Sequence, residues 1–197
     1  MTIVPRKIDP HYRWWVKTPA SGLAVSLAEV KTFARIDTDA ENNLLTTMIG
    51  AVTEITEKFL GRALLEQTMI LSFDQWPDNG IIELPRPPLV ELIEVRSLDQ
   101  DGATTEYAST NYMIRADVVP PEIILRDSCN STDNVDRYTG GWEIEYKAGY
   151  GEASDVPNGI KAGIMAWVAS YYDSRVLEDL PPAGAIRILE HYKIHRF

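Results

Sequence analysis

The stretch that decides the fold is residues 44–60, LLTTMIGAVTEITEKFL. Its large apolar side chains recur every three or four residues, which is the spacing of one face of an α-helix. They are Leu45, Met48, Ile49, Val52, Ile55 and Phe59. Gly61 follows at once, and glycine commonly ends a helix because it adopts a left-handed backbone at little steric cost. The sequence therefore predicts an amphipathic helix that needs a second apolar surface to pack against.

A shorter helix is predicted upstream of this stretch. Residues 26–29 (SLAE) form a capping-box pattern, in which the Ser26 hydroxyl accepts a backbone N–H and Glu29 reaches back to the cap. The helix should run to about Arg35, after which residues 37–39 (DTD) break it and can cap the next helix. Residues 1–25 hold three prolines and show no sustained period, so they are predicted to form an extended arm.

Strand composition replaces helical spacing between residues 66 and 148. Candidate strands, bounded by turns such as residues 76–80 (WPDNG) and 99–102 (DQDG), cover residues 68–73, 81–84, 89–98, 112–114, 123–125 and 142–147. In the last of these, clean alternation predicts that Trp142, Ile144 and Tyr146 face inward. The stretch is interpreted as a β insertion.

Helical spacing returns near Pro157, and Ile160, Ile164, Trp167 and Tyr171 share one face of the predicted helix. Two prolines at 181 and 182 end this region. The predicted fold class is mainly α with a β insertion (α+β), in which both ends of the chain build a helical core around a small β region. The predicted domains are an N-terminal arm (1–25), a connector domain (26–185, with helices at 26–61 and 157–177 and the insertion at 66–148) and a C-terminal docking tail (186–197).

The net charge of −10 is unevenly distributed along the chain. Residues 1–17 carry +3 and residues 186–197 carry +2, which leaves −15 on the body between them. A body this acidic is a poor tight binder of DNA, because that binding depends on lysine and arginine replacing counterions. It could still line a passage through which DNA slides. No apolar run approaches the ~20 residues of a membrane-spanning helix, so no membrane partner is expected.

The sequence offers no catalytic, metal-binding or cofactor-binding constellation, and none is predicted. Cys129 is the single cysteine, which excludes an intramolecular disulfide. His191 and His195 are four residues apart but lack the glutamate of the zinc-protease pattern, so a solvated pair is favoured. Trp14 and Trp15 are unusual in a polar, basic arm. Tryptophans in this setting often anchor protein interfaces, although they could also fold back onto the core.

These segments, taken in order, resemble the bacteriophage head–tail connector (adaptor) family, which includes the adaptor proteins of gene transfer agents. The matching stretches are residues 25–31 (VSLAEVK), 35–37 (RID), 49–62, 67–68 (QT), 84–88 (LPRPP), 146–151 (YKAGYG), 156–157 (VP), 160–162 (IKA), 171–175 and 189–192 (LEHY), with Arg196. No single motif is decisive, and it is their order and spacing over most of residues 13–197 that is specific.

The resemblance implies a structural protein and not an enzyme. Family members form rings, usually of twelve subunits, between the portal and the next tail component, so the expected partners are the portal protein, a stopper or tail-completion protein and further copies of the chain. The DNA channel would continue through the ring without specific DNA binding. The protein would be made in a bacterial cytoplasm and would end in the neck of a virion or virus-like particle. The alternatives are a nucleic-acid-binding packaging factor and a small enzyme of unknown type.

Two interface predictions follow. Neighbouring subunits are expected to meet through the faces of the two longest amphipathic helices, at residues 39–60 and 158–175. The C-terminal tail is expected to swing independently of the core and to dock on the portal, and the N-terminal tryptophans are the next candidate if the tail does not make this contact. The candidate interface residues are Trp14, Trp15, Arg187, Leu189, Tyr192, Lys193, Arg196 and Phe197.

Overall fold

The structure, a computed structural model, describes residues 12–126, 140–177 and 180–194. In this part of the chain four α-helices are present, with bounds α1 (Leu27–Ala34), α2 (Asn42–Leu60), α3 (Asn158–Ser174) and α4 (Ala183–Leu189). Short 3₁₀ turns lie at Ser109–Asn111 and Glu190–Tyr192. No helix among the described residues has the length and apolar character needed to cross a bilayer.

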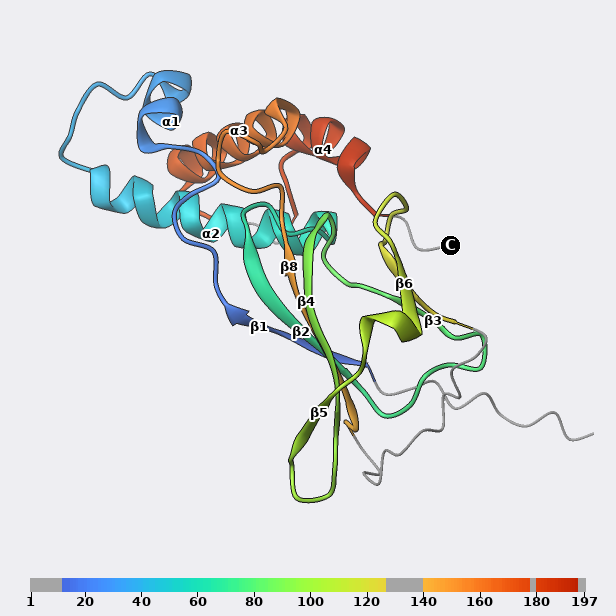
Figure 1. Ribbon diagram of the computed structural model, residues 1–197. Coiled ribbons are helices and arrows are strands. Elements are labelled where there is room, and N and C mark those ends of the chain that lie inside the picture. The colour runs from blue at the N-terminus through green and yellow to red at the C-terminus, as the bar shows by residue number, and fades with distance from the viewer. Residues whose placement is uncertain (1–11, 127–139, 178–179, 195–197) are drawn as a thin grey trace, which may run out of the picture.

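The strands of the described residues form two antiparallel sheets. The larger sheet has the order β1-β2-β8-β4-β5, and its strands are β1 (Arg13–Thr18), β2 (Gln67–Phe73), β8 (Trp142–Ala148), β4 (Leu89–Leu98) and β5 (Thr104–Glu106). The smaller sheet has the order β3-β7-β6, with β3 (Ile81–Glu83), β7 (Glu122–Leu125) and β6 (Tyr112–Arg115). Figure 1 shows the helices gathered on one side of the molecule and the larger sheet on the other.

The predicted fold class, mainly α with a small β region, is wrong. Helix and strand contents are about equal in the described residues, and the strands build two sheets. The region between the helices supplies most of the strands, but β1 comes from residues that were assigned to an extended arm. β1 pairs with β2 fifty or more positions away, so its hydrogen bonds are non-local and leave no periodic signal in the arm itself.

The start of α1 and the end of α2 form as the local sequence predicts, but residues 37–39 do not cap α2, whose N-cap is Glu41 with no side-chain cap hydrogen bond. The Ser26 hydroxyl accepts the Glu29 N–H at 3.2 Å, and the Glu29 carboxylate accepts the Ser26 N–H at 2.7 Å, so the capping box is complete. Gly61 ends α2 with a left-handed backbone (φ 71°). α3 packs on both α1 and α2, which confirms that helices from the two ends of the chain share one core.

Two hydrophobic cores result. The helical core is mostly aliphatic around Trp167, with Leu45, Ile49 and Val52 from α2 and Ile164 from α3 fully buried. The sheet core is rich in aromatic rings, and Trp142, Ile144 and Tyr146 face into it as the alternation predicts. Within it lie Phe73, Trp76 and Trp142, whose ring centroids are 5.3–6.4 Å apart.

Backbone hydrogen bonds join the two layers where α2 leads into β2 and β8 leads toward α3. The Ala63 N–H donates to the Pro87 carbonyl at 3.2 Å, and the Tyr150 N–H donates to the Leu64 carbonyl at 3.1 Å. Gly149 sits in this junction at φ 130°, and a Cβ there would collide with the Leu65 backbone. Only glycine fits both requirements, so this position fixes how the layers join.

Candidate interaction surfaces

The candidate sites in the described residues lie on the surface of the protein: an exposed edge strand, a cavity beside it and a network of ion pairs. No group of three or more His, Cys, Asp or Glu side chains in this part of the chain could hold a metal ion. Cys129 and His195, which were weighed as candidates from the sequence, lie outside the described residues.

The first surface is the edge strand β1, which is exposed along its whole length. Trp14 and Trp15 are each 42% exposed and point to opposite faces of the sheet, as successive strand residues must. Tyr12 and Val16 are exposed to a similar extent. The two tryptophans therefore lie on the sheet and present large apolar area to the outside, which is the property expected of an interface anchor.

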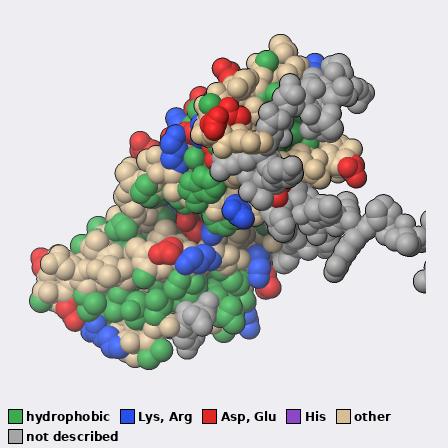
Figure 2. All heavy atoms as spheres, turned by 90° about the horizontal axis from the view of Figure 1, so that it is seen from below, with side chains coloured by type: hydrophobic (Ala, Val, Ile, Leu, Met, Phe, Trp, Pro, Cys, Tyr) green, Lys and Arg blue, Asp and Glu red, His purple; other side chains and the backbone are tan. Residues whose placement is uncertain are grey.

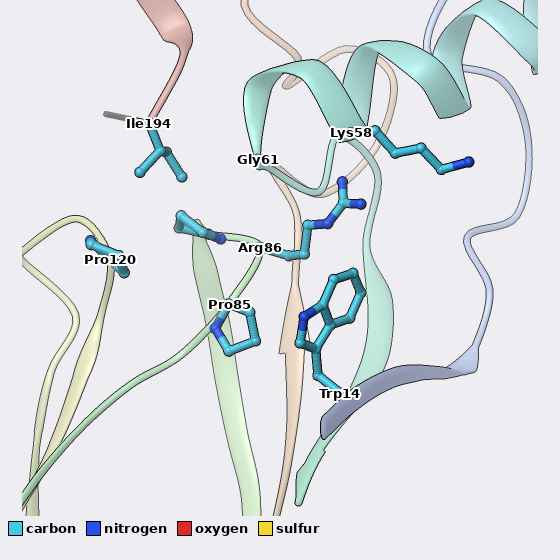
Figure 3. Close-up of a pocket in the computed structure, with 8 residues that line it drawn as sticks. Trp14, Lys58, Gly61, Pro85, Arg86, Pro120 and Ile194 are labelled. Carbon is cyan, nitrogen blue, oxygen red and sulfur yellow. The ribbon is translucent and has the colours of Figure 1, made fainter. Parts of the chain in front are cut away.

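A cavity of about 380 Å³ lies beside Trp14, between the end of α2 and the proline-rich segment after β3 (Figure 3). Trp14, Lys58, Gly61, Pro85, Arg86, Pro87, Pro120 and Ile194 line it. The Arg86 guanidinium lies over the Trp14 ring, 5.1 Å from its centroid, and donates to the Arg62 carbonyl at 3.2 Å. Burial lowers the pKa of Arg86, and the nearby Glu57 carboxylate opposes that shift. The cavity thus combines proline and tryptophan walls with a cationic rim.

Glu57 secures the end of α2 against the sheet. Its carboxylate accepts the Leu64 N–H at 2.7 Å and the Gln67 side-chain N–H at 3.1 Å. Burial raises the pKa of Glu57, although these hydrogen bonds and the charge of Arg86 act in the opposite direction. The carboxylate is therefore a structural acceptor at the junction of the two layers.

The outer face of the larger sheet carries a network of ion pairs. Arg96 on β4 contacts Glu143 at 2.8 Å, Glu94 at 2.9 Å and Glu145 at 3.3 Å. Lys17 on β1 contacts Glu145 at 2.6 Å. Burial disfavours the charged form of Arg96, but its hydrogen bonds to Glu143 and Glu94 outweigh that effect and raise its pKa. The network ties β1, β8 and β4 together across the face.

The C-terminal segment packs against the helices as far as Ile194. Leu189 is fully buried in the helical core, and Arg62 donates to the Tyr192 carbonyl at 2.6 Å. The Lys193 ammonium lies 4.4 Å from the centroid of the Phe59 ring. The Ile194 N–H donates to the Leu60 carbonyl at 3.0 Å. This differs from the expectation that the segment moves independently of the core.

The candidate interface residues of this segment consequently fall into three groups. Arg187 is exposed on α4 and is free to meet a partner. Leu189 is buried, and Tyr192 and Lys193 are half-buried against the helices. Arg196 and Phe197 lie outside the described residues.

A cluster of three side chains joins the start of α2 to the end of α3. The Tyr172 hydroxyl and the Arg175 guanidinium both donate to the Glu41 carboxylate, the latter at 3.1 Å. Arg175 also lies over the Tyr172 ring, 4.5 Å from its centroid. These hydrogen bonds, first from Tyr172 and then from Arg175, lower the pKa of Glu41. The apolar faces of both helices are buried inside the subunit, so little of the surface that motivated the helix-face prediction remains exposed.

The sequence identified Trp14 and Trp15 as candidate interface residues, but it did not predict the cavity beside Arg86 or the ion-pair network. The position of Arg86 between prolines in residues 84–88 was a usable signal, because such a segment has few conformations. Glu143 and Glu145 could also have been placed on the outer face, because they alternate with the inward-facing aromatic residues of β8. Their basic partners come from other strands, which the alternation does not identify.

Residues 24–114 match the model of the phage gp6-like head-tail connector protein family. The matched part begins in the segment before α1 and ends in β6. The resemblance to head–tail connectors that the sequence indicated is thereby confirmed. A comparison with curated protein sequences gives no match.

Solved structures extend the likeness over almost the whole chain. A chain from the neck of an empty gene transfer agent (GTA) particle, computed with C6 symmetry, has a TM-score of 0.80 at 21% identity, covering 94% of this chain and 97% of that one. A chain from the virion of a native GTA particle gives 0.78 at 22% identity, covering 93% and 96%. A chain from the neck of a native GTA particle, computed with C12 symmetry, gives 0.72 at 20% identity, covering 93% and 97%. The fold is shared over both layers.

Proposed function

We propose that this chain is a structural head–tail connector in the neck of a tailed phage or gene transfer agent particle. The observation that carries the proposal is the family match at residues 24–114 joined to a shared fold over 94% of the chain with a protein of a GTA neck. The described surfaces are consistent with this role, since they offer exposed aromatic side chains on β1 and exposed acids in the β4–β5 turn for protein contacts.

The proposed assembly is a ring between the portal protein and a stopper or tail-completion protein. Two of the similar neck chains come from particles computed with C6 and with C12 symmetry. A ring of twelve satisfies both, because sixfold rotations are a subset of twelvefold rotations. Twelve copies are therefore proposed here as well, arranged head to tail so that each subunit uses two different surfaces.

The ring is proposed to continue the DNA channel without gripping the DNA. The body between residues 17 and 186 carries −15, which repels phosphate and favours sliding over binding. A packaging factor that binds nucleic acid would instead need a basic stripe. Affinity for duplex DNA at about 150 mM salt separates the two, because a binding protein should reach at least the nonspecific range of roughly 10⁻⁴ to 10⁻⁶ M.

The portal contact is proposed for the C-terminal segment, residues 186–197, with Trp14 and Trp15 as the second candidate. Removing the whole segment is a poor test, because it takes Leu189 out of the helical core. Arg187→Glu combined with removal of residues 195–197 leaves that packing intact. The altered protein should fold normally but attach to portal-bearing heads at a reduced level, and normal attachment would shift the contact to the tryptophans.

The overall proposal is tested by deleting the gene in a particle-producing strain and imaging the products. Heads filled with DNA but lacking tails are expected, and the native chain supplied from a plasmid should restore tailed particles. Complete, tailed particles in the deletion strain would refute a connector role.

A further inference from the structure

The larger sheet has two edges without a strand partner among the described residues. Its order is β1-β2-β8-β4-β5, so β1 forms one edge and β5 forms the other. Both edge strands are exposed throughout. Figure 1 shows that the β4–β5 hairpin extends away from the body of the molecule. An open edge offers unpaired backbone N–H and C=O groups to an incoming strand.

The register of the sheet places opposite charges at the two ends of one row. Following the paired residues from edge to edge, the row consists of Arg13, Ser72, Glu143, Arg96 and Glu106. Residues paired in one row point to the same face of a sheet. The row therefore begins with an arginine at the β1 edge and ends with a glutamate at the β5 edge.

Residues near the two edges add to the contrast between a basic β1 end and an acidic β5 end of the row. Near β1 lie Lys17, which pairs with Glu145, and, around the cavity beside Trp14, Arg86 and Lys58, of which Lys58 pairs with Glu54. The hairpin carries the exposed acids Asp99 and Asp101 in its turn. The Asp99 carboxylate accepts the N–H groups of Asp101 and Ala103 at 3.0 and 2.8 Å, so the turn is held in one conformation. One edge is basic and the other is a preformed acidic arm.

Apolar contacts accompany the charges. The next row begins with Trp14 and passes through Leu71, Ile144 and Val95, whose carbonyl accepts the Tyr107 N–H at 2.7 Å. This row brings Trp14 to the β1 edge, whereas Tyr107 beside the other edge is half-buried against Trp142, with ring centroids 5.0 Å apart. Figure 2 shows hydrophobic side chains gathered in a band beside Lys and Arg on the face seen from the hairpin end. Aromatic residues flanked by charges are typical of protein interfaces.

From these observations we infer that a second copy of this chain lays its β4–β5 hairpin against β1, so that the sheet continues from one subunit to the next. Glu106 then meets Arg13 of the neighbouring copy, and Trp14 and Trp15 become buried. The two strands run in the same direction, because four antiparallel pairings separate β1 from β5 within the sheet. The joint is therefore parallel.

Pairing of β5 with β1 of a second copy fits better than a symmetric pairing of the β1 strands of two copies. Two β1 strands would bring Arg13 and Lys17 of one copy against the same basic strand of the other and would close at a dimer. A joint between the two different edges pairs opposite charges and can propagate around a ring. This inference rests on the proposed function, because only a head-to-tail assembly uses both edges of every subunit.

Photo-crosslinking of the full-length chain tests the contact. A benzoylphenylalanine replaces Thr105 on β5, and a control chain carries it at Thr32, which is exposed on α1. Both are irradiated in assembled particles and as purified protein at high concentration. In particles, the Thr105 probe should give a dimer whose crosslink maps to residues 12–18, and the Thr32 probe should not. A crosslink that maps elsewhere in the chain or to another protein, or no dimer, overturns the inference.

Charge exchange provides an independent check. Arg13→Glu and Glu106→Arg should each lower the crosslinking yield about two- to fivefold, the range that one exposed ion pair supplies. The two changes combined in one chain should restore the yield, because the pair is reformed with its charges reversed. Circular dichroism verifies that each variant is folded. Failure of the combined variant to recover, with both single variants folded and impaired, contradicts the Arg13–Glu106 contact.

Imaging of the particle neck distinguishes failure of the edge-to-edge contact from failure of the connector role. A neck ring that contains this chain, together with crosslinks outside residues 12–18, leaves the connector role standing and removes the edge-to-edge contact. Particles whose neck lacks the chain remove the connector role itself.

Discussion

The helical layer and the sheet layer differ in how much of their bonding capacity they use within one subunit. α1 begins with a capping box at Ser26, the first three helices end at residues with left-handed backbone such as Gly61, and the helices bury their apolar faces against one another. The sheet buries one face as an aromatic core and balances charges on the other, yet both its edges lack a strand partner in the described residues. The helices use their apolar faces within the subunit, whereas further strands can still be added at the edges of the sheet.

This difference is the basis of the proposed assembly surface. A helix satisfies its backbone hydrogen bonds internally, so only its side chains are available to a neighbour. An edge strand retains backbone donors and acceptors, and β1 adds two exposed tryptophans. In the proposed assembly, the helical layer therefore supplies stability and the sheet supplies the contacts between subunits.

The largest expected effect comes from emptying either core. Trp167→Ala in the helical core and Trp142→Ala in the sheet core should each cost about 3–5 kcal/mol of unfolding free energy, since both side chains are almost fully buried. The junction near Gly149 couples the layers, so each variant should unfold in one transition. Denaturation followed by circular dichroism and by fluorescence measures this, and two separate transitions would mean that the layers are independent.

Overpacking at α4 should have the next largest effect. Gly163→Ala places a Cβ about 2.6 Å from the Leu189 side chain, which should cost about 1–3 kcal/mol. Gly50→Ala is the matched control, because a Cβ at this position of α2 has open space and should stabilise the helix by up to about 1 kcal/mol. Equal effects of the two substitutions on the denaturation midpoint would argue that α4 is not held on α3.

The carboxylate at the junction makes a pH-dependent contribution. Burial raises the pKa of Glu57, so the folded state holds this proton more tightly than the unfolded state, and stability is lost as the pH rises through the folded pKa. Glu57→Gln keeps an acceptor for the Leu64 N–H but removes the charge, and it should flatten this fall.

Glu57→Ala is the contrasting variant, because it leaves the Leu64 N–H without its acceptor and should cost about 1–3 kcal/mol. Thermal melts between about pH 4 and pH 8 compare the variants. If the melting temperature of the Gln variant falls with pH as steeply as that of the native protein, Glu57 is not the source of the pH dependence.

The smallest effect is expected at the exposed cluster that joins the two long helices. Hydrogen bonds from Tyr172 and Arg175 lower the pKa of Glu41, so the stability they provide is present above the ordinary carboxyl pKa and is lost as the pH falls through the lowered value. Tyr172→Phe should reduce this acid-dependent loss slightly, and Tyr171→Phe should not. Melting temperatures of the two variants at neutral and acid pH provide the test. If both variants lose the same stability on acidification, the hydrogen bond from Tyr172 to Glu41 does not contribute.

The sequence by itself determined the elements whose signals are local. The capping box at residues 26–29, the helical spacing of residues 44–60 and the alternation of Trp142, Ile144 and Tyr146 all appear where they were predicted. Helix caps and side-chain periods arise from neighbours along the chain, so they can be read without knowing the fold. The order of these segments was also enough to indicate the head–tail connector family.

Tertiary structure alone decided the rest, because strand pairing joins residues distant in the sequence. It turned Arg13–Thr18 from an arm into an edge strand, and it brought Arg96 to the acids of β8. It also buried Leu189 in the helical core, although the segment that contains this residue was predicted to move independently of the core. Whether a short apolar segment packs on its own core or reaches a partner depends on the surface that the rest of the fold leaves open, and no local pattern encodes that surface.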